Sequence, residues 1–450
     1  MITDDFTSGD IKKQLMTMAI PVSVGLFFNT MFNVVDTFYA GRLSTSSLAG
    51  MSLSFSIFFI LIAIVSGIST GLSALLSIAY GKKDHELVRS LTSNGILLTF
   101  IISMVLTVVG YVFSPVLLRL LGAENETLIE GSRYVRGIYA GTLFFGINSA
   151  MNALLSSRGV TKPYRNFLII GFVLNLILDP LFIYGPFGLP RLGTLGVALA
   201  TVVVQIIGSI YLGYKCIKIL KLDFSIFEKK SYKIEIQSEI LSQGIPASLN
   251  LMTIAIGIFL INYFIYRHGN DASIAGYGAA MRIEQIALLP ALGLNTAAMT
   301  IAGQNFGAGQ YDRVRKTYVE AIKVGMIIMT FGMILVYPLA PFLVGIFNKE
   351  HDVIFEGTRY LRIDFLAFNA YIILNVCLSI LQAIKKPRYA IGLGIYRQLL
   401  MPFVLFTLLG SVLGLGLVGI WIGIVATTWS AAILTLFITR YELSKIIDQR

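Results

Sequence analysis

Long runs of apolar residues, separated by short polar or glycine-containing segments, dominate this chain. Within each run the apolar residues are continuous and do not alternate with polar ones, which favours α-helices over β-strands. A helix needs about 20 such residues to cross a hydrocarbon core of roughly 30 Å. The pattern therefore predicts an all-α membrane protein with twelve transmembrane helices, at 14–40, 47–73, 91–120, 131–155, 164–185, 193–217, 239–266, 274–303, 317–347, 357–384, 389–411 and 415–439.

Composition agrees with this interpretation. Apolar residues make up 56% of the 450 residues and charged residues only 13%, whereas soluble domains average about 25% charged residues. So few charges cannot cover the water-facing surface of a soluble protein of this length. The first ten residues are polar and acidic and do not resemble a cleaved signal peptide, so we expect the first apolar run to direct insertion.

Basic residues gather in alternate connecting segments. One set of segments holds 23 Lys and Arg residues and the other set holds 9. Because cytoplasmic loops carry the excess of positive charge, we predict a multi-pass protein of the cell (inner) membrane with both termini in the cytoplasm. The same bias explains the net charge of +11 without a nucleic-acid partner.

The chain contains an internal repeat. Short matches recur at a nearly constant shift of 224 to 226 residues: Ile20-Pro21 with Ile245-Pro246, Leu48-Ala49-Gly50 with Ile274-Ala275-Gly276, and Lys162-Pro163 with Lys386-Pro387. Each copy holds an even number of spans, so both copies insert in the same orientation. We predict two pseudo-symmetric six-helix lobes, 1–217 and 239–450, joined by a basic cytoplasmic linker at 218–238.

Polar side chains interrupt the first and fifth apolar runs. Asn29, Asn33 and Asp36 are spaced by four and three residues, which places them on one helix face. Asn175 and Asp179 share a face in the same way. A carboxylate inside a membrane span is costly and normally faces a cavity or partner that serves an ion or substrate. We therefore expect Asp36 and Asp179 to act together on such a path.

These acids are predicted to lie at one depth. Asp36 precedes Arg42 by six residues and Asp179 precedes Gly185 by six, so both lie about 9 Å below the outer helix ends. Thr201, on the sixth span, reaches a similar level. Oxygen ligands of this kind suit Na⁺, while two neighbouring carboxyl groups can instead share a proton. The sequence leaves both ions open, together with the alternative that an Asp–Asn hydrogen bond only fixes helix packing.

The second copy lacks these acids. The repeat aligns Asp36 with Asn262 and Asp179 with Phe403, so a coupling role would belong to the first lobe alone. Other charges of the second half receive different interpretations. Glu284 is a candidate for either a cavity or helix packing, and it does not share a face with Arg282. Asp364 is expected to snorkel or to form a surface pair near an outer helix end, and Arg397 to anchor a lipid headgroup.

Further residues are candidates for a substrate cavity. Aromatic rings in the outer half of the first lobe can bind a flat cation, although an interfacial aromatic belt is the alternative. A proline in the first span can act as a hinge or form a static kink. The candidate cavity residues are Tyr134, Tyr139, Asn148, Asn152, Asn33 and Glu284, and the candidate hinge is Pro21.

Sequence signatures of several enzyme classes are missing. The chain has no P-loop sequence, no nucleophile elbow and no HExxH or Cys/His metal motif. Its two cysteines, Cys216 and Cys377, are too far apart to suggest a disulfide framework. We predict no enzymatic activity and no cofactor, so transport would draw its energy from an ion gradient.

The chain resembles the MATE family of multidrug and toxic compound extrusion transporters over nearly its whole length. The resemblance rests on Pro21, Val35-Asp36-Thr37-Phe38, Leu48-Ala49-Gly50, Asn175 with Asp179-Pro180, Leu195-Gly196-Val197 before Thr201, and Gly303-Gln304-Asn305-Phe306-Gly307-Ala308-Gly309. It implies export of small organic cations or amphipathic compounds by antiport against Na⁺ or H⁺, with these small molecules and the lipid bilayer as the partners of the protein. We expect the transporter to be a monomer.

The resemblance also implies roles for individual residues. The cation site of the family maps onto Asp36, Asn175, Asp179 and Thr201, and Tyr134 resembles a tyrosine near it. Some relatives carry an aspartate on helix 10, where this chain has Asn369, which makes the chain similar to the DinF-like branch. Two alternatives remain: a flippase for lipid-linked substrates from the same superfamily, and a non-transporting membrane receptor or scaffold.

Overall fold

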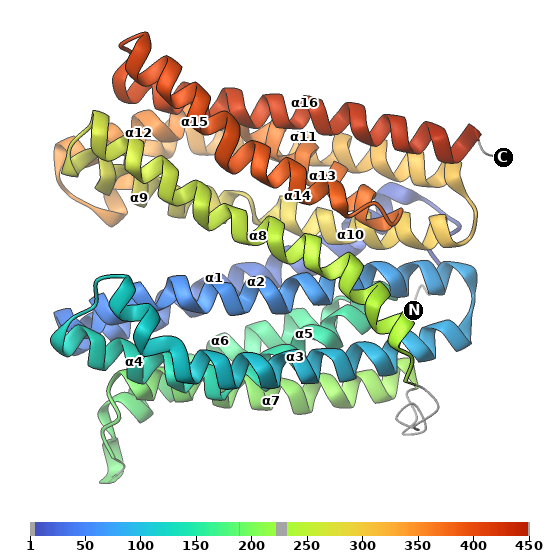
Figure 1. Cartoon of the computed structure of the whole chain (residues 1–450), viewed down its shortest axis with the longest axis horizontal. Helices are drawn as coiled ribbons and strands as arrows, with labels where there is room; N and C mark the ends of the chain where they lie inside the picture. The colour runs from blue at the N-terminus through green and yellow to red at the C-terminus, as the bar shows by residue number, and fades with distance from the viewer. Residues whose placement is uncertain (1–4, 189, 222–231, 449–450) are drawn as a thin grey trace. The chain divides into compact units, whose positions relative to one another are not determined.

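The computed structural model describes residues 5–188, 190–221 and 232–448. Helices account for nearly all of the first half (Figure 1). They are α1 (Ile11–Leu43), α2 (Thr45–Lys82), α3 (His85–Leu120), α4 (Asn125–Ala140), α5 (Thr142–Ser157), α6 (Lys162–Tyr184), the short 3₁₀ helix η1 (Pro186–Gly188) and α7 (Thr194–Leu220).

The second half has the same character with more breaks. It contains two π-helical stretches, in which the backbone bonds reach one residue further than in an α-helix. Its elements are α8 (Ile234–His268), α9 (Asp271–Ala287), α10 (Leu289–Gly307), α11 (Tyr311–Phe347), α12 (His351–Asp364), η4 (Phe365–Ala367), α13 (Phe368–Ala383), α14 (Arg388–Ile395), η5 (Tyr396–Leu400), α15 (Met401–Leu405), η6 (Phe406–Val412) and α16 (Gly416–Asp448).

The helices have the length and apolarity of membrane spans. Among the described residues, ten helical segments qualify singly. Two bent pairs qualify when each is taken as one span: α4 with α5, bent by 48°, and α9 with α10, bent by 41°. The total of up to twelve agrees with the twelve apolar runs of the sequence and confirms the all-α membrane fold.

The structure reproduces the internal repeat helix by helix. Five helices of the first half begin 226 residues before their counterparts: α2 and α9 at Thr45 and Asp271, α3 and α11 at His85 and Tyr311, α4 and α12 at Asn125 and His351, α5 and α13 at Thr142 and Phe368, and α6 and α14 at Lys162 and Arg388. A close helix contact repeats with them. A Cβ atom on Gly50 would lie 2.7 Å from the backbone nitrogen of Gly131, and one on Gly276 would lie 2.7 Å from that of Gly357.

Contacts between residues divide the chain into two compact units. The N-terminal unit comprises Val24–Ser248, and the C-terminal unit comprises the described residues up to Ser23 together with those from Leu249 onward. The beginning of α1 therefore packs with the C-terminal unit, where the Phe6 amide donates to Gln304 Oε1 at 3.2 Å. The lobe boundaries 1–217 and 239–450 stay a prediction, and residues 222–231 of the expected linker lie outside the described residues.

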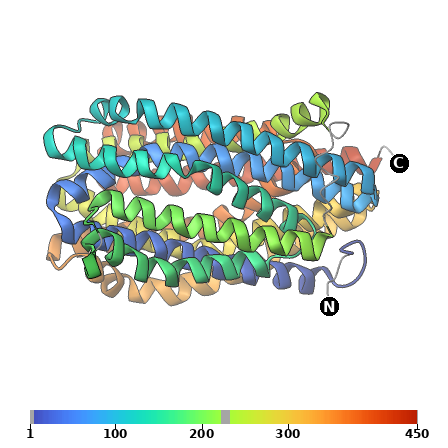
Figure 2. The same ribbon diagram turned by 90° about the horizontal axis from the view of Figure 1, so that it is seen from below.

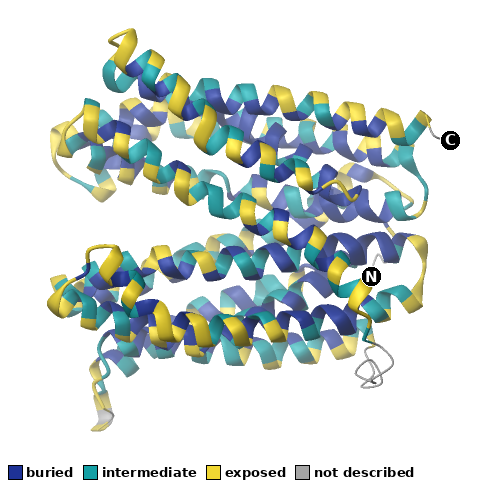
Figure 3. Cartoon of the chain, viewed as in Figure 1, coloured by how far each residue is buried: buried dark blue, intermediate teal, exposed yellow. Residues whose placement is uncertain are grey.

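Within each unit, long helices pack side by side (Figures 1 and 2). In the N-terminal unit, α2 packs on α3, α4 and α5, and α6 packs along α7. Exposed residues recur along several helices (Figure 3). Large apolar side chains are among them, for example Val108 of α3 and Phe331 of α11, which are 62% and 69% exposed. Such faces suit contact with lipid tails, whereas polar side chains are held inside the units.

Candidate functional site

Two aspartates meet in the middle of the N-terminal unit. Asp36 lies on α1 and Asp179 on α6, and they are only 5% and 0% exposed. The Nδ2 atom of Asn175 donates to Asp36 Oδ1 and to Asp179 Oδ1, both at 3.0 Å. The Oγ1 atom of Thr201, on α7, donates to Asp36 Oδ2 at 3.4 Å. The structure thus brings together the four side chains that the sequence singled out, and we call them the acid centre.

Local features of α6 and α7 position this centre. Asn175 and Asp179 are one helical turn apart, so one amide can reach both carboxyl groups. Pro180 follows inside α6 and has no amide hydrogen, which leaves the carbonyl of Leu176 without its helical donor. On α7, the Thr201 hydroxyl also lies 3.1 Å from Val197 O, so Asp36 and this carbonyl compete for one hydrogen. The carboxyl groups consequently receive few donors.

The acid centre has unused acceptor atoms. Asn175 Oδ1 and Asp179 Oδ2 are buried and have no hydrogen-bond partner among the described residues. Burying charged or polar oxygen atoms without partners is costly. These oxygens, together with those of Asp36 and Thr201, can accept a proton or coordinate a small cation. Among the described residues, no group of three or more His, Cys, Asp or Glu side chains suits a metal ion, so any cation would bind through amide and hydroxyl oxygens as well.

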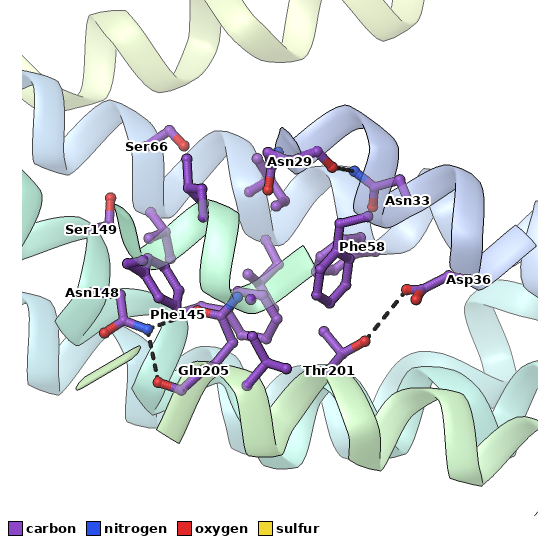
Figure 4. A pocket seen from close by; sticks show the side chains of 18 of the residues that line it. Asn29, Asn33, Asp36, Phe58, Ser66, Phe145, Asn148, Ser149, Thr201 and Gln205 are labelled. Carbon is purple, nitrogen blue, oxygen red and sulfur yellow. Dashed lines mark hydrogen bonds between the residues drawn. The ribbon is translucent and has the colours of Figure 1, made fainter. Parts of the chain in front are cut away.

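A pocket of about 370 Å³ opens beside the acid centre within the same unit (Figure 4). Asp36 and Thr201 lie at one end of it, and Asn148 and Gln205 lie at the other, with aromatic rings between them. None of the described residues that line it is basic. The lining includes Asn29, Phe32, Asn33, Asp36, Phe55, Phe58, Phe59, Ser66, Tyr134, Phe145, Asn148, Ser149, Tyr164, Phe167, Gly171, Thr201 and Gln205.

The candidate cavity residues fall into two groups. Asn33, Tyr134 and Asn148 line the pocket. Tyr139 and Asn152 are not among the residues that line it. Tyr139 is 4% exposed and donates through its hydroxyl to Ile57 O at 3.1 Å, which is a packing contact.

Two further candidates lie in or at the edge of the C-terminal unit. Glu284 belongs to α9 and accepts a hydrogen bond from the Tyr360 hydroxyl at 2.7 Å. Pro21 lies inside α1, which is helical on both sides of it. The hinge role of Pro21 stays a prediction.

A family model described as MatE matches residues 21–181 and 246–407, one segment in each half of the repeat. The chain belongs to the MatE family. It is 26% identical to the probable multidrug resistance protein YoeA of Bacillus subtilis over 372 residues. The aligned region covers 82% of this chain and 80% of YoeA. It is also 26% identical to an FAD transporter of Shewanella oneidensis, over 88% of this chain and 87% of the transporter.

Solved MATE structures agree with the fold. One is an outward-facing conformation of a multidrug resistance MATE transporter of the MOP superfamily. It superposes with a TM-score of 0.92, covers 98% of both chains and is 25% identical. The pocket and acid centre described above are therefore features of a MATE-family chain.

Sequence reasoning missed Gln205, which lines the MATE pocket, and Ser209, which bonds to the lining residue Asn148. Gln205 and Ser209 follow Thr201 at intervals of four residues, so the three side chains share one face of α7. Asn148 Nδ2 donates to Gln205 Oε1 at 2.7 Å, and the Ser209 hydroxyl donates to Asn148 Oδ1 at 2.9 Å. The regular spacing was a usable signal. No sequence pattern distinguished the aromatic residues of the lining, because phenylalanine is common throughout the spans.

Two expectations for the C-terminal unit were wrong. Asp364 is 1% exposed and forms no surface pair; its Oδ1 atom accepts a hydrogen bond from the Tyr371 hydroxyl at 3.4 Å. The guanidinium carbon of Arg397 lies 4.9 Å from the centre of the Tyr371 ring, so its contact is this ring inside the unit. Position along the helix suggested the membrane surface, whereas packing of α12 against α9 and α16 turned Asp364 inward.

Proposed function

We propose that this protein is a secondary antiporter that exports small organic cations or amphipathic compounds in exchange for Na⁺ or H⁺. The observation that carries the proposal is that Asp36 belongs to both the pocket and the acid centre. Its side chain lines the pocket, and it is also hydrogen-bonded through Asn175 to Asp179. A change of charge in the acid centre therefore changes the electrostatic potential in the pocket directly.

Coupling follows from this shared side chain. When a proton or Na⁺ occupies the acid centre, its negative charge is neutralised and the pocket holds a cationic substrate less strongly. When the ion leaves, the charge returns and the pocket regains affinity for the substrate. Each ligand thus lowers the affinity for the other, which is the requirement for exchange.

The lining supports the proposed substrate class. Aromatic faces bind flat, positively charged groups, and the amides of Asn29, Asn33, Asn148 and Gln205 offer donors and acceptors to polar substituents. A phosphate-bearing substrate, such as FAD or a lipid-linked sugar, would find no basic partner among the described lining residues. This favours efflux of cations over the flippase alternative and over the activity of the FAD transporter relative.

We also propose the arrangement expected from the sequence. The protein would lie in the cell (inner) membrane with cytoplasmic termini, and one chain would suffice, since all residues of the acid centre and pocket come from one unit. A DinF-like assignment is supported by Asn369, which donates from Nδ2 to Thr330 Oγ1 at 3.2 Å in place of an acid.

The test is substrate transport in liposomes that contain the purified protein. Ethidium serves as the flat cationic probe, and a Na⁺ gradient and a pH gradient are imposed separately. We expect one of the gradients to drive uptake, and Asp36→Asn to abolish the gradient-driven part. The control is Asp352→Asn, which makes the same chemical change at a side chain 84% exposed.

Three outcomes bear on the proposal. Loss in Asp36→Asn with wild-type rates in Asp352→Asn supports it. Wild-type rates in both variants would contradict a coupling role for Asp36. No response to either gradient in the unmodified protein would contradict antiport altogether.

A further inference from the structure

The C-terminal unit contains a second group of ionisable side chains, which we call the C-terminal cluster: Glu284 of α9, Tyr360 and Asp364 of α12, Tyr371 of α13 and Arg397 of η5. The Tyr360 hydroxyl donates to Glu284 Oε2 at 2.7 Å, and the Tyr371 hydroxyl donates to Asp364 Oδ1 at 3.4 Å. Arg397 lies over the Tyr371 ring. Two carboxyl groups on different helices are thus each bonded to a tyrosine.

The repeat places this cluster where the N-terminal unit has its pocket. Along α2, α3, α4, α5 and α6 and their counterparts, which begin 226 residues later, residues 226 positions apart occupy equivalent places in the two units. Four pocket-lining residues have such partners in the cluster: Phe58 and Glu284, Tyr134 and Tyr360, Phe145 and Tyr371, and Gly171 and Arg397. Charged side chains therefore occupy, in the C-terminal unit, the places that enclose open space in the N-terminal unit.

The charges of the cluster do not balance. One guanidinium group can neutralise one carboxylate, which leaves the other uncompensated. Asp364 Oδ2 is buried and has no hydrogen-bond partner among the described residues. The rings of Tyr277 of α9 and Trp421 of α16 pack on Tyr360 and carry no charge, and the Thr428 hydroxyl of α16 bonds to Tyr371. The nearby guanidinium group of Arg362 lies over the ring of Tyr337 of α11. A second positive charge is needed to bury both acids.

A proton fits this need better than a metal ion does. Arg397 already places a positive charge beside Tyr371, which opposes entry of a further cation. The tyrosine hydroxyls donate to the carboxyl groups and so occupy acceptor sites that a metal would require. A proton needs only one oxygen, and Asp364 Oδ2 is free to take it.

A small cavity borders the cluster. It has a volume of about 40 Å³, and its lining includes Tyr371, Arg397, Thr427 and Thr428. Thr427 is 2% exposed, and its hydroxyl has no hydrogen-bond partner among the described residues. A polar cavity of this size can hold a water molecule. The cavity therefore adjoins the tyrosine that bonds to Asp364.

We propose that Glu284 and Asp364 together hold one exchangeable proton, which makes the C-terminal cluster a second ion-binding site of the protein. The proton comes from a hydronium ion of the surrounding water, which becomes a water molecule as a new O–H bond forms on Asp364 Oδ2. The site lies in a different unit from the acid centre, so it does not depend on which ion the acid centre takes or on the antiport proposed above.

Infrared spectroscopy of the full-length protein in lipid vesicles tests this directly. The absorbance of protonated carboxyl groups is followed as the pH is raised. The measurement uses the Asp36→Asn, Asp179→Asn double variant, which removes the carboxyl groups of the acid centre. We expect a protonated-carboxyl band that disappears reversibly with rising pH. Adding Asp364→Asn or Glu284→Gln should abolish this band, whereas adding Asp352→Asn should leave it unchanged.

Tyr371→Phe provides a variant that keeps both acids. It removes the hydroxyl bonded to Asp364, so the band should remain but disappear at a different pH. This variant decides the matter if Asp364→Asn fails to fold. The proposal is overturned by a double variant without a titrating band, by a band that persists at every pH, or by a band that neither Glu284→Gln nor Tyr371→Phe affects.

Discussion

The two units of this MATE-family protein share the same helix arrangement, but they fill equivalent interior positions with different side chains. In the N-terminal unit, Gly171 has no side chain and borders an open pocket. At the equivalent place in the C-terminal unit, Arg397 extends over Tyr371. One unit therefore keeps space for a ligand, and the other fills that space with its own cation. The comparison shows that a repeat can preserve helix packing while the chemistry inside it diverges.

The two units preserve a close backbone contact between one pair of helices in each. Gly50 and Gly131 let α2 and α4 approach closely, and Gly276 and Gly357 do the same for α9 and α12. In each case a Cβ atom would meet backbone atoms, which cannot rotate away as a side chain can. The side chains that diverged, such as Phe58 and Glu284, point into interior space where several chemistries fit.

Exchanging the two interiors should have the largest effect. Gly171→Arg places the guanidinium of the C-terminal unit into the pocket of the N-terminal unit. The side chain occupies pocket volume and repels a cationic substrate, so we expect ethidium binding to weaken by more than about tenfold, or roughly 1.4 kcal/mol. Fluorescence titration of the purified protein measures the affinity.

Gly171→Ala is the matched control for this exchange. Its Cβ atom would lie 2.9 Å from Val204 Cγ1, so Val204 must shift as it must in Gly171→Arg, but Gly171→Ala adds no charge and only one methyl group. Near-normal binding in this variant, with strong loss in Gly171→Arg, would support the comparison. Equal affinity in all three proteins would show that this part of the pocket does not bind substrate.

Adding a methyl group at the repeated glycine contact should have a smaller effect, and the same one in each unit. Gly50→Ala and Gly276→Ala both force a Cβ atom against backbone, and overpacking of this kind costs about 1–3 kcal/mol. We expect lower thermal stability in both variants. Gly332→Ala, which meets no atom within 4 Å, should be as stable as the unmodified protein or more so. A loss in only one unit would mean that the repeat is not equivalent at this contact.

Removing the polar end of the pocket should have the smallest effect. Gln205→Leu deletes the side-chain oxygen that accepts a hydrogen bond from Asn148. We expect substrates with polar substituents to bind about fivefold less tightly, which is the worth of about one hydrogen bond of 1 kcal/mol. A purely aromatic cation should bind as before. Identical losses for both kinds of substrate would instead indicate a general change in pocket shape.

The sequence by itself determined the helices, the repeat and the residues of the acid centre. Twelve apolar runs, the recurrence at about 226 residues and the pairs of polar residues one helical turn apart are all local patterns. The acids were conspicuous for the same reason, because a carboxylate inside an apolar run is costly wherever the helix turns. Asp36, Asn175, Asp179 and Thr201 could therefore be named together before their contacts were known.

Only the tertiary structure decided which side chains meet. That one amide of Asn175 bridges both acids depends on how α1 packs against α6, which no local pattern contains. The candidate cavity residue Tyr139 donates its hydroxyl to Ile57 O and is not among the residues that line the pocket. Asp364 was expected at the surface and is buried. A helix presents a different face to each neighbour, and the choice of neighbours is a property of the whole packed unit.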